Sequence, residues 1–137
     1  MTSRLLLEWP QGRVCVGRHS RKSVRKHRAA SVARLLETLW GGDETLIVIS
    51  SDLSHFLPYD VAQQVDAETA SRILKLDSPI DGEEACGCRP LNGLLELARE
   101  KHLHAELLAL CNSGDTAGDK RRVVGYGSFA LMEPAPT

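Results

Sequence analysis

The sequence predicts an α/β fold in which helices flank a mixed, mostly parallel sheet. Three observations carry this prediction. Apolar residues recur at three- and four-residue spacing over residues 30–40, which is typical of an amphipathic helix. Gly41 and Gly42 then end that helix, and residues 45–49 form an aliphatic run that suits a strand buried on both faces. The 137 residues are 42% hydrophobic and 4% aromatic, as expected of one modest domain with an aliphatic core.

Two further helices are predicted after this strand. Residues 58–76 predict a helix in two pieces, because apolar positions recur at helical spacing early and late in the segment. Asp66 is the candidate N-terminal cap of the second piece. Pro90 suits the first turn of the next helix, and the leucine stripe that follows it ends near Lys101.

Two strands are predicted in the C-terminal third of the chain. Residues 107–111 form one apolar run, and residues 123–131 form another. Between them, residues 113–120 are dense in turn-forming residues. The order of residues in this loop does not match a P-loop, because no Lys-Ser or Lys-Thr pair follows its second glycine. We therefore expect a rim or interface loop rather than a phosphate site.

Charge divides the chain near residue 28. Residues 1–28 carry eight Lys and Arg against one acid, whereas the remainder carries nine against seventeen acids. We expect a basic, poorly ordered segment at 1–28, a folded domain at 29–132 and a tail at 133–137. Nucleic-acid binding by the basic segment is a weak alternative, since few aromatic side chains are present to stack on bases.

Several classes of protein are disfavoured. No apolar run is long enough for a membrane span, and the N-terminus has no apolar signal-peptide core, so we expect a cytoplasmic protein that does not enter the membrane. In that compartment cysteines are expected to be reduced thiols. None of their spacings matches the C-x-x-C pattern of structural zinc; the four are Cys15, Cys86, Cys88 and Cys111.

The candidate chemistry follows the strand predicted at 45–49. Asp52 and His55 lie beyond its carboxyl end, where the side chains of open α/β sheets converge on ligands. A carboxylate three residues from an imidazole can orient the ring or share a metal with it. The alternatives are a cap or turn at Asp52 and a structural histidine at His55.

Cys86 is the third candidate. It precedes Gly87 and the helix expected near Pro90, so the field of that helix can activate the thiol, and the glycine permits close approach of a metal or ligand. A buried, inert cysteine is the alternative. A hydrolase pair of Cys86 with His55 is a minor option, since no nucleophile motif surrounds this cysteine.

Three motifs follow one another along the chain: SSDLSHFLPYD at residues 50–60, ACG at 85–87, and NSGDTAGD at 112–119 leading into VVGYG at 123–127. In this order they resemble the Memo family, and in particular its microbial branch called AmmeMemoRadiSam system protein B. The resemblance extends from about residue 32 to residue 131, so it is more specific than a match to one motif.

The resemblance implies a fold similar to class III extradiol dioxygenases, with a pocket that binds iron or copper and supports redox chemistry. It implies that Asp52, His55 and Cys86 are the metal ligands and catalytic residues, and that partners belong to the AmmeMemoRadiSam system. The histidine motifs of the family's N-terminal half have no match in residues 1–28. We therefore expect the C-terminal half of a larger single domain, truncated, with reduced or no activity and exposed sheet edges. Whether the chain is catalytic stays open, and the alternative function is a non-enzymatic peptide- or protein-binding module that uses the same pocket.

Overall fold

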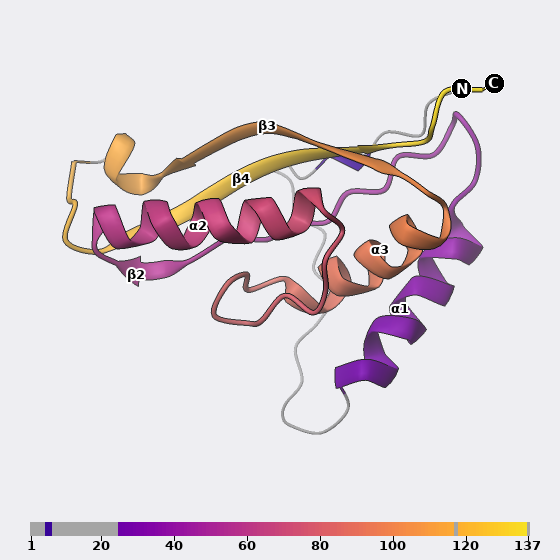
Figure 1. Cartoon of the computed structure of the whole chain (residues 1–137), viewed down its shortest axis with the longest axis horizontal. Coiled ribbons are helices and arrows are strands. Elements are labelled where there is room, and N and C mark those ends of the chain that lie inside the picture. The colour runs from indigo at the N-terminus through magenta and orange to yellow at the C-terminus, as the bar shows by residue number, and fades with distance from the viewer. Residues whose placement is uncertain (1–4, 7–24, 117, 137) are drawn as a thin grey trace.

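Helices and strands are interspersed along the part of the chain that the computed structural model describes, residues 5–6, 25–116 and 118–136 (Figure 1). The elements are β1 (Leu5–Leu6), α1 (Arg25–Leu39), β2 (His55–Leu57), α2 (Tyr59–Leu74), α3 (Cys88–Glu100), β3 (His104–Asn112), the 3-10 helix η1 (Ser113–Asp115) and β4 (Val123–Met132). Most of the basic segment predicted at 1–28 lies outside the described residues. No helix in the described ranges is long and apolar enough to cross a membrane.

The sheet is built around β4. β1, β2 and β3 each pair with β4, and each pairing is antiparallel. The α/β class is therefore confirmed, but the expectation of a mostly parallel sheet is wrong. The physical reason lies in the connection: a short segment joins β3 to β4, whereas a parallel pair needs a crossover of a dozen or more residues.

The strand predicted at residues 45–49 does not form in the described structure. These residues belong to no helix or strand, and they pack on one side only. Ile49 is 6% exposed, whereas Leu46 and Val48 are more than half exposed, at 54% and 52%. The prediction of a strand buried on both faces is wrong, because alternate side chains of this run face solvent.

The three predicted helices are present. α1 contains most of the predicted segment 30–40, and Gly41 beyond its end has φ +60, a conformation that glycine adopts without strain. α2 is one continuous helix rather than two pieces. Asp66 lies in its middle and is buried, so its prediction as a cap is wrong. α3 has Pro90 in its first turn, as predicted.

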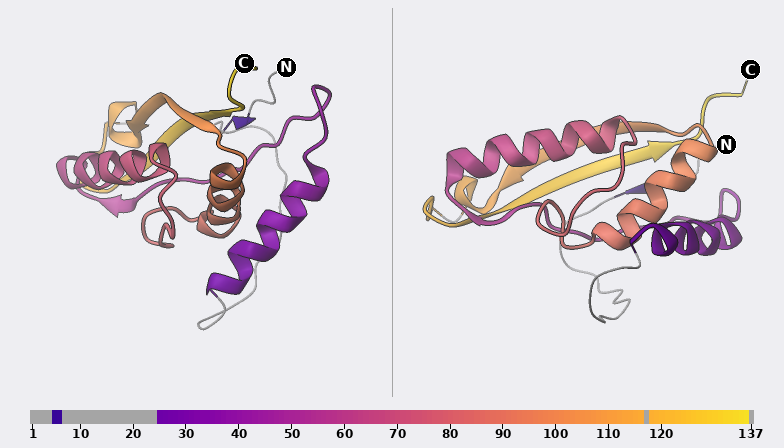
Figure 2. Two further views of the ribbon diagram at one scale, coloured as in Figure 1. Left: turned by 45° about the vertical axis from the view of Figure 1, so that its right-hand side comes forward. Right: turned by 60° about the horizontal axis from the view of Figure 1, so that its bottom comes forward.

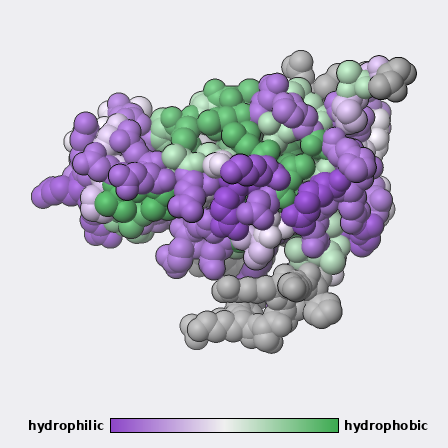
Figure 3. Space-filling view, viewed as in Figure 1, coloured by the Kyte–Doolittle hydropathy of each residue, from purple (hydrophilic) through white to green (hydrophobic). Residues whose placement is uncertain are grey.

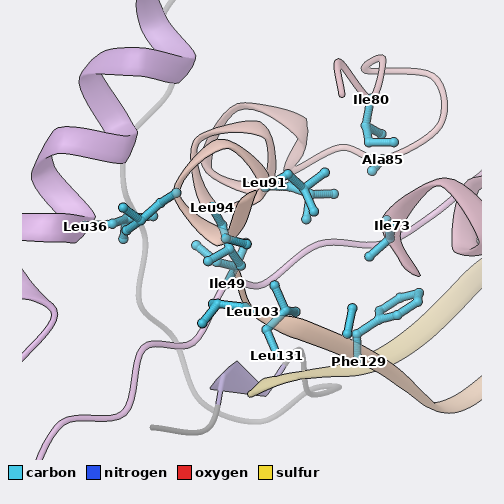
Figure 4. Packing of buried hydrophobic residues seen from close by; sticks show 14 of the residues in the cluster. Leu36, Ile49, Ile73, Ile80, Ala85, Leu91, Leu94, Leu103, Phe129 and Leu131 are labelled. Carbon is cyan, nitrogen blue, oxygen red and sulfur yellow. The ribbon is translucent and has the colours of Figure 1, made fainter. Parts of the chain in front are cut away.

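The leucine stripe of α3 forms the centre of the core. α3 lies between α1 and the sheet, and α2 runs along the sheet (Figure 2). Figure 4 shows Leu91 and Leu94 of α3 among side chains from α1, the 45–49 run and the strands. Ile49 joins this cluster, so the 45–49 run is anchored immediately before the residues that carry the candidate site.

Candidate metal centre

Asp52 and His55 lie in a loop that is anchored to β4. We call residues 50–55 the donor loop. The backbone N–H of Leu53 donates to the carbonyl oxygen of Gly125 at 2.9 Å, and the N–H of Gly125 donates to the carbonyl of Ser54 at 2.9 Å. These two hydrogen bonds fix the centre of the loop, with Asp52 on one side and His55 on the other.

Cys86 reaches the donor loop through a second set of contacts. We call residues 85–87 the thiol loop. The N–H of Cys86 donates to the carbonyl of Asp52 at 3.3 Å, and the N–H of Asp52 donates to the Cys86 Sγ at 3.3 Å. The N–H of Gly87 donates to the Ser51 Oγ at 2.9 Å. A Cβ atom at Gly87 would lie 2.7 Å from the carbonyl oxygen of Ser50, so only glycine lets the two loops approach this closely.

These contacts bring the three predicted side chains together. Within the described ranges, Asp52, His55 and Cys86 form a group whose ligand atoms all lie within 4.8 Å of one another. The His55 Nε2 lies 3.4 Å from the Asp52 Oδ2. The side chains of His55 and Asp52 are 31% and 36% exposed, and Cys86 is exposed, so the group faces solvent.

The donor types of the group suit a single transition-metal ion. A tetrahedral ion bound through nitrogen, oxygen and sulfur holds its ligand atoms about 3.3 to 3.8 Å apart, given its bond lengths. The 3.4 Å between the His55 Nε2 and the Asp52 Oδ2 is in this range, and all three ligand atoms lie within 4.8 Å of one another. An imidazole, a thiol and a carboxylate are donors that together suit iron, copper or zinc rather than calcium or magnesium.

Asp66 lies beside the donor loop, whereas the sequence predicted it only as a helix cap. It lies on α2, is 2% exposed, and its Oδ1 accepts a hydrogen bond from the N–H of Ser54 at 2.9 Å. Burial raises the pKa of Asp66, and the hydrogen bond from the Ser54 N–H and the charge of His55 oppose that rise. Helical spacing could have placed it, because Ala62, Thr69 and Ile73 on the same face are also buried.

Tyr126 is a second residue near the site whose place the sequence prediction missed. It lies on β4 directly opposite Cys111 of β3 and next to Gly125, which anchors the donor loop. Burial raises the pKa of Tyr126, and the charges of Asp52 and Cys111 raise it further. The phenol therefore stays neutral beside the acidic group of the site. Its place in the motif VVGYG at residues 123–127 is the signal that could have pointed to this residue.

The other predicted features are not members of the donor group. The 113–120 loop begins with η1 and is attached to the start of α2, where the Tyr59 hydroxyl donates to the Asp115 carboxylate. Lys120 lies over the Tyr59 ring, with 4.4 Å between the Nζ and the ring centroid. His104 is exposed beside Glu106. Cys88 and Cys111 are unbridged, and Cys15 lies outside the described residues.

The chain is an α/β unit in which imidazole, thiol and carboxylate donors lie together at the surface. This arrangement defines a candidate metal-binding protein. The model of the family described as "Memo-like protein" matches residues 14–130, and the chain belongs to this family. The resemblance found in the motifs is therefore confirmed.

Curated relatives carry the same family name. A MEMO1 family protein of Pyrobaculum aerophilum is 32% identical over 115 residues, covering 78% of this chain and 40% of the relative. One from Methanosarcina barkeri is 30% identical over 128 residues, covering 86% of this chain and 46% of the relative. One from Methanosarcina acetivorans is 31% identical over 128 residues, with the same coverages of 86% and 46%. The chain thus spans less than half the length of these relatives.

Proposed function

We propose that the chain contributes Asp52, His55 and Cys86 to a metal-binding redox pocket similar to that of class III extradiol dioxygenases. One observation carries the proposal: the three ligand atoms, from two separate loops, lie within 4.8 Å of one another. Backbone hydrogen bonds between the loops support the same arrangement without any ion. Iron or copper is the ion we propose, and it would supply redox chemistry when bound.

Each donor has a distinct part in this proposal. The Cys86 sulfur is the soft ligand, and it accepts a hydrogen bond from the N–H of Asp52. The His55 imidazole is the nitrogen ligand, and the Asp52 carboxylate at 3.4 Å either orients that ring or binds the ion beside it. Three partly exposed donors hold an ion less tightly than a closed set of four, so we propose weak metal binding and reduced or no catalysis by this chain.

Metal titration tests the proposal. The full chain is titrated anaerobically with Fe(II) and Cu(I), and binding is compared in wild type, His55→Ala, Cys86→Ala and the double variant. We expect about one ion per chain in the wild type and none in the double variant. His104→Ala and Cys111→Ser are matched controls, because both side chains are exposed and lie outside the donor group. Equal loss of binding in the controls, or no binding by the wild type, contradicts the proposal.

A non-enzymatic peptide- or protein-binding module that uses the same pocket is the second candidate function. Exposed apolar side chains on β3 offer a further surface to a protein partner: Leu107, Leu108 and Leu110 are 40%, 51% and 36% exposed. Figure 3 shows apolar side chains gathered over β3. Proteins of the AmmeMemoRadiSam system are the proposed partners. This candidate is supported if the metal-free wild type binds one such purified protein and the His55→Ala/Cys86→Ala variant does not.

A further inference from the structure

The buried carboxylate of Asp66 accepts a hydrogen bond from the donor loop. Burying a carboxylate in the middle of a helix costs free energy unless its oxygens gain partners. Asp66 gains one: its Oδ1 accepts the N–H of Ser54 at 2.9 Å. Ser54 directly precedes His55 and lies two residues after Asp52. The partner of Asp66 is therefore the backbone between two of the three proposed ligands.

Ser54 is also held by β4. The N–H of Gly125 donates to the carbonyl of Ser54, so both backbone groups of Ser54 have partners, one on α2 and one on β4. Gly125 also lies against the Asp66 carboxylate, since a Cβ atom at Gly125 would be 1.9 Å from the Asp66 Oδ2. Asp66, Ser54 and Gly125 are therefore in mutual contact at the donor loop.

We propose that Asp66 is a positioning residue for the candidate metal centre, acting through the Ser54 amide on the placement of Asp52 and His55. Partners that orient metal ligands without touching the ion typically change metal affinity about 10- to 100-fold when they are lost. The consequence for metal affinity rests on the proposed function. The consequence for the donor loop rests on the hydrogen bond alone.

Four variants separate the hydrogen bond from other roles of the residue. Asp66→Ala removes the acceptor. Asp66→Asn keeps an oxygen that can accept from Ser54, so it should rescue the loop. Thr69→Val is the matched control: Thr69 is 1% exposed on the same helix, but its hydroxyl donates to Val65 of that helix and not to the donor loop. Gly125→Ala displaces the Asp66 carboxylate from the β4 side and should act like Asp66→Ala.

The first measurement uses Co(II) as the probe ion. We expect the Co(II) dissociation constant to rise about 10- to 100-fold in Asp66→Ala and Gly125→Ala, and to stay within about threefold of wild type in Asp66→Asn and Thr69→Val. Loss of affinity in Asp66→Asn as large as in Asp66→Ala overturns the proposal, because the negative charge rather than the positioning hydrogen bond would then matter.

The second measurement needs no metal. Amide hydrogen exchange is followed at Leu53 and Ser54 in the metal-free chain, with the amides paired between β3 and β4 as the internal reference. We expect exchange at Ser54 to rise at least about tenfold in Asp66→Ala, with the reference amides unchanged. Continued protection of Ser54 in that variant overturns the proposal. If wild type binds no Co(II), the proposed function fails, and the exchange result alone decides the positioning role.

Discussion

Gly87→Ala should separate the donor loop from the thiol loop. The new Cβ would lie 2.7 Å from the carbonyl oxygen of Ser50 and 2.8 Å from the Cβ of Ser51, where ordinary contacts begin at about 3.4 Å. The loops must therefore move apart by about 0.7 Å, and the 3.3 Å hydrogen bond from the Asp52 N–H to the Cys86 Sγ lengthens to about 4.0 Å. Overpacking of this kind costs about 1–3 kcal/mol of stability.

Chemical denaturation and Co(II) titration measure the two effects. We expect the free energy of unfolding to fall by about 1–3 kcal/mol and the Co(II) affinity to fall at least about tenfold. Gly82→Ala is the matched control, because a Cβ there meets only the Cys88 Sγ, at an ordinary 3.9 Å. If Gly87→Ala binds Co(II) as tightly as Gly82→Ala does, the close approach of the loops does not set the donor geometry and the reasoning is refuted.

Three further predictions concern the core, the buried acid and the 113–120 loop. Leu94→Ala in α3, where Leu94 is 0% exposed, should lower the free energy of unfolding by about 2–5 kcal/mol in urea denaturation, and unchanged stability would contradict the assigned core. The folded pKa of Asp66 is raised above its ordinary 3.8, so its stabilising contribution is complete below that value and is lost as the pH rises through the folded pKa. The stability of wild type relative to Asp66→Asn should therefore fall as the pH rises above 3.8, and a constant difference would argue against a raised pKa. The Tyr59 hydroxyl holds the pKa of Asp115 below its ordinary value, so Tyr59→Phe should raise that pKa in an NMR titration, and an unchanged pKa would place the cause elsewhere.

Local sequence patterns predicted the helices and strands that depend mainly on neighbouring residues along the chain. Helical spacing predicted α1 and α3, and the apolar runs predicted β3 and β4. The motif residues Asp52, His55 and Cys86 are brought together as the resemblance implied, although 34 positions separate the Asp52 N–H from the Cys86 sulfur that it contacts. Spacing alone placed Asp52 near His55. Apart from the minor option of a hydrolase pair of Cys86 with His55, only the family motif connected Cys86 with them.

Features that depend on tertiary contacts were not predictable in this way. The 45–49 run has the composition of a buried strand, yet it pairs with no strand in the described structure, because side-chain type does not show which neighbours are present. Asp66 has the residue type of a cap and was predicted as one. In the structure its side chain instead contacts the donor loop through the Ser54 N–H, and Ser54 in turn is bonded to Gly125 of β4. No sequence pattern shows which backbone groups a buried side chain will meet.

The donor group owes its geometry to main-chain contacts rather than to burial. Its side chains are partly exposed, so packing cannot fix them, and the loops that carry them have little regular structure. The hydrogen bonds of Leu53, Ser54 and Asp52 to β4, α2 and the thiol loop take the place of that packing. These hydrogen bonds are made between protein groups alone, unlike the bonds of a structural zinc site, where the ion supplies the folding free energy. Removal of an ion should therefore change what the site binds and leave the fold of the described residues in place.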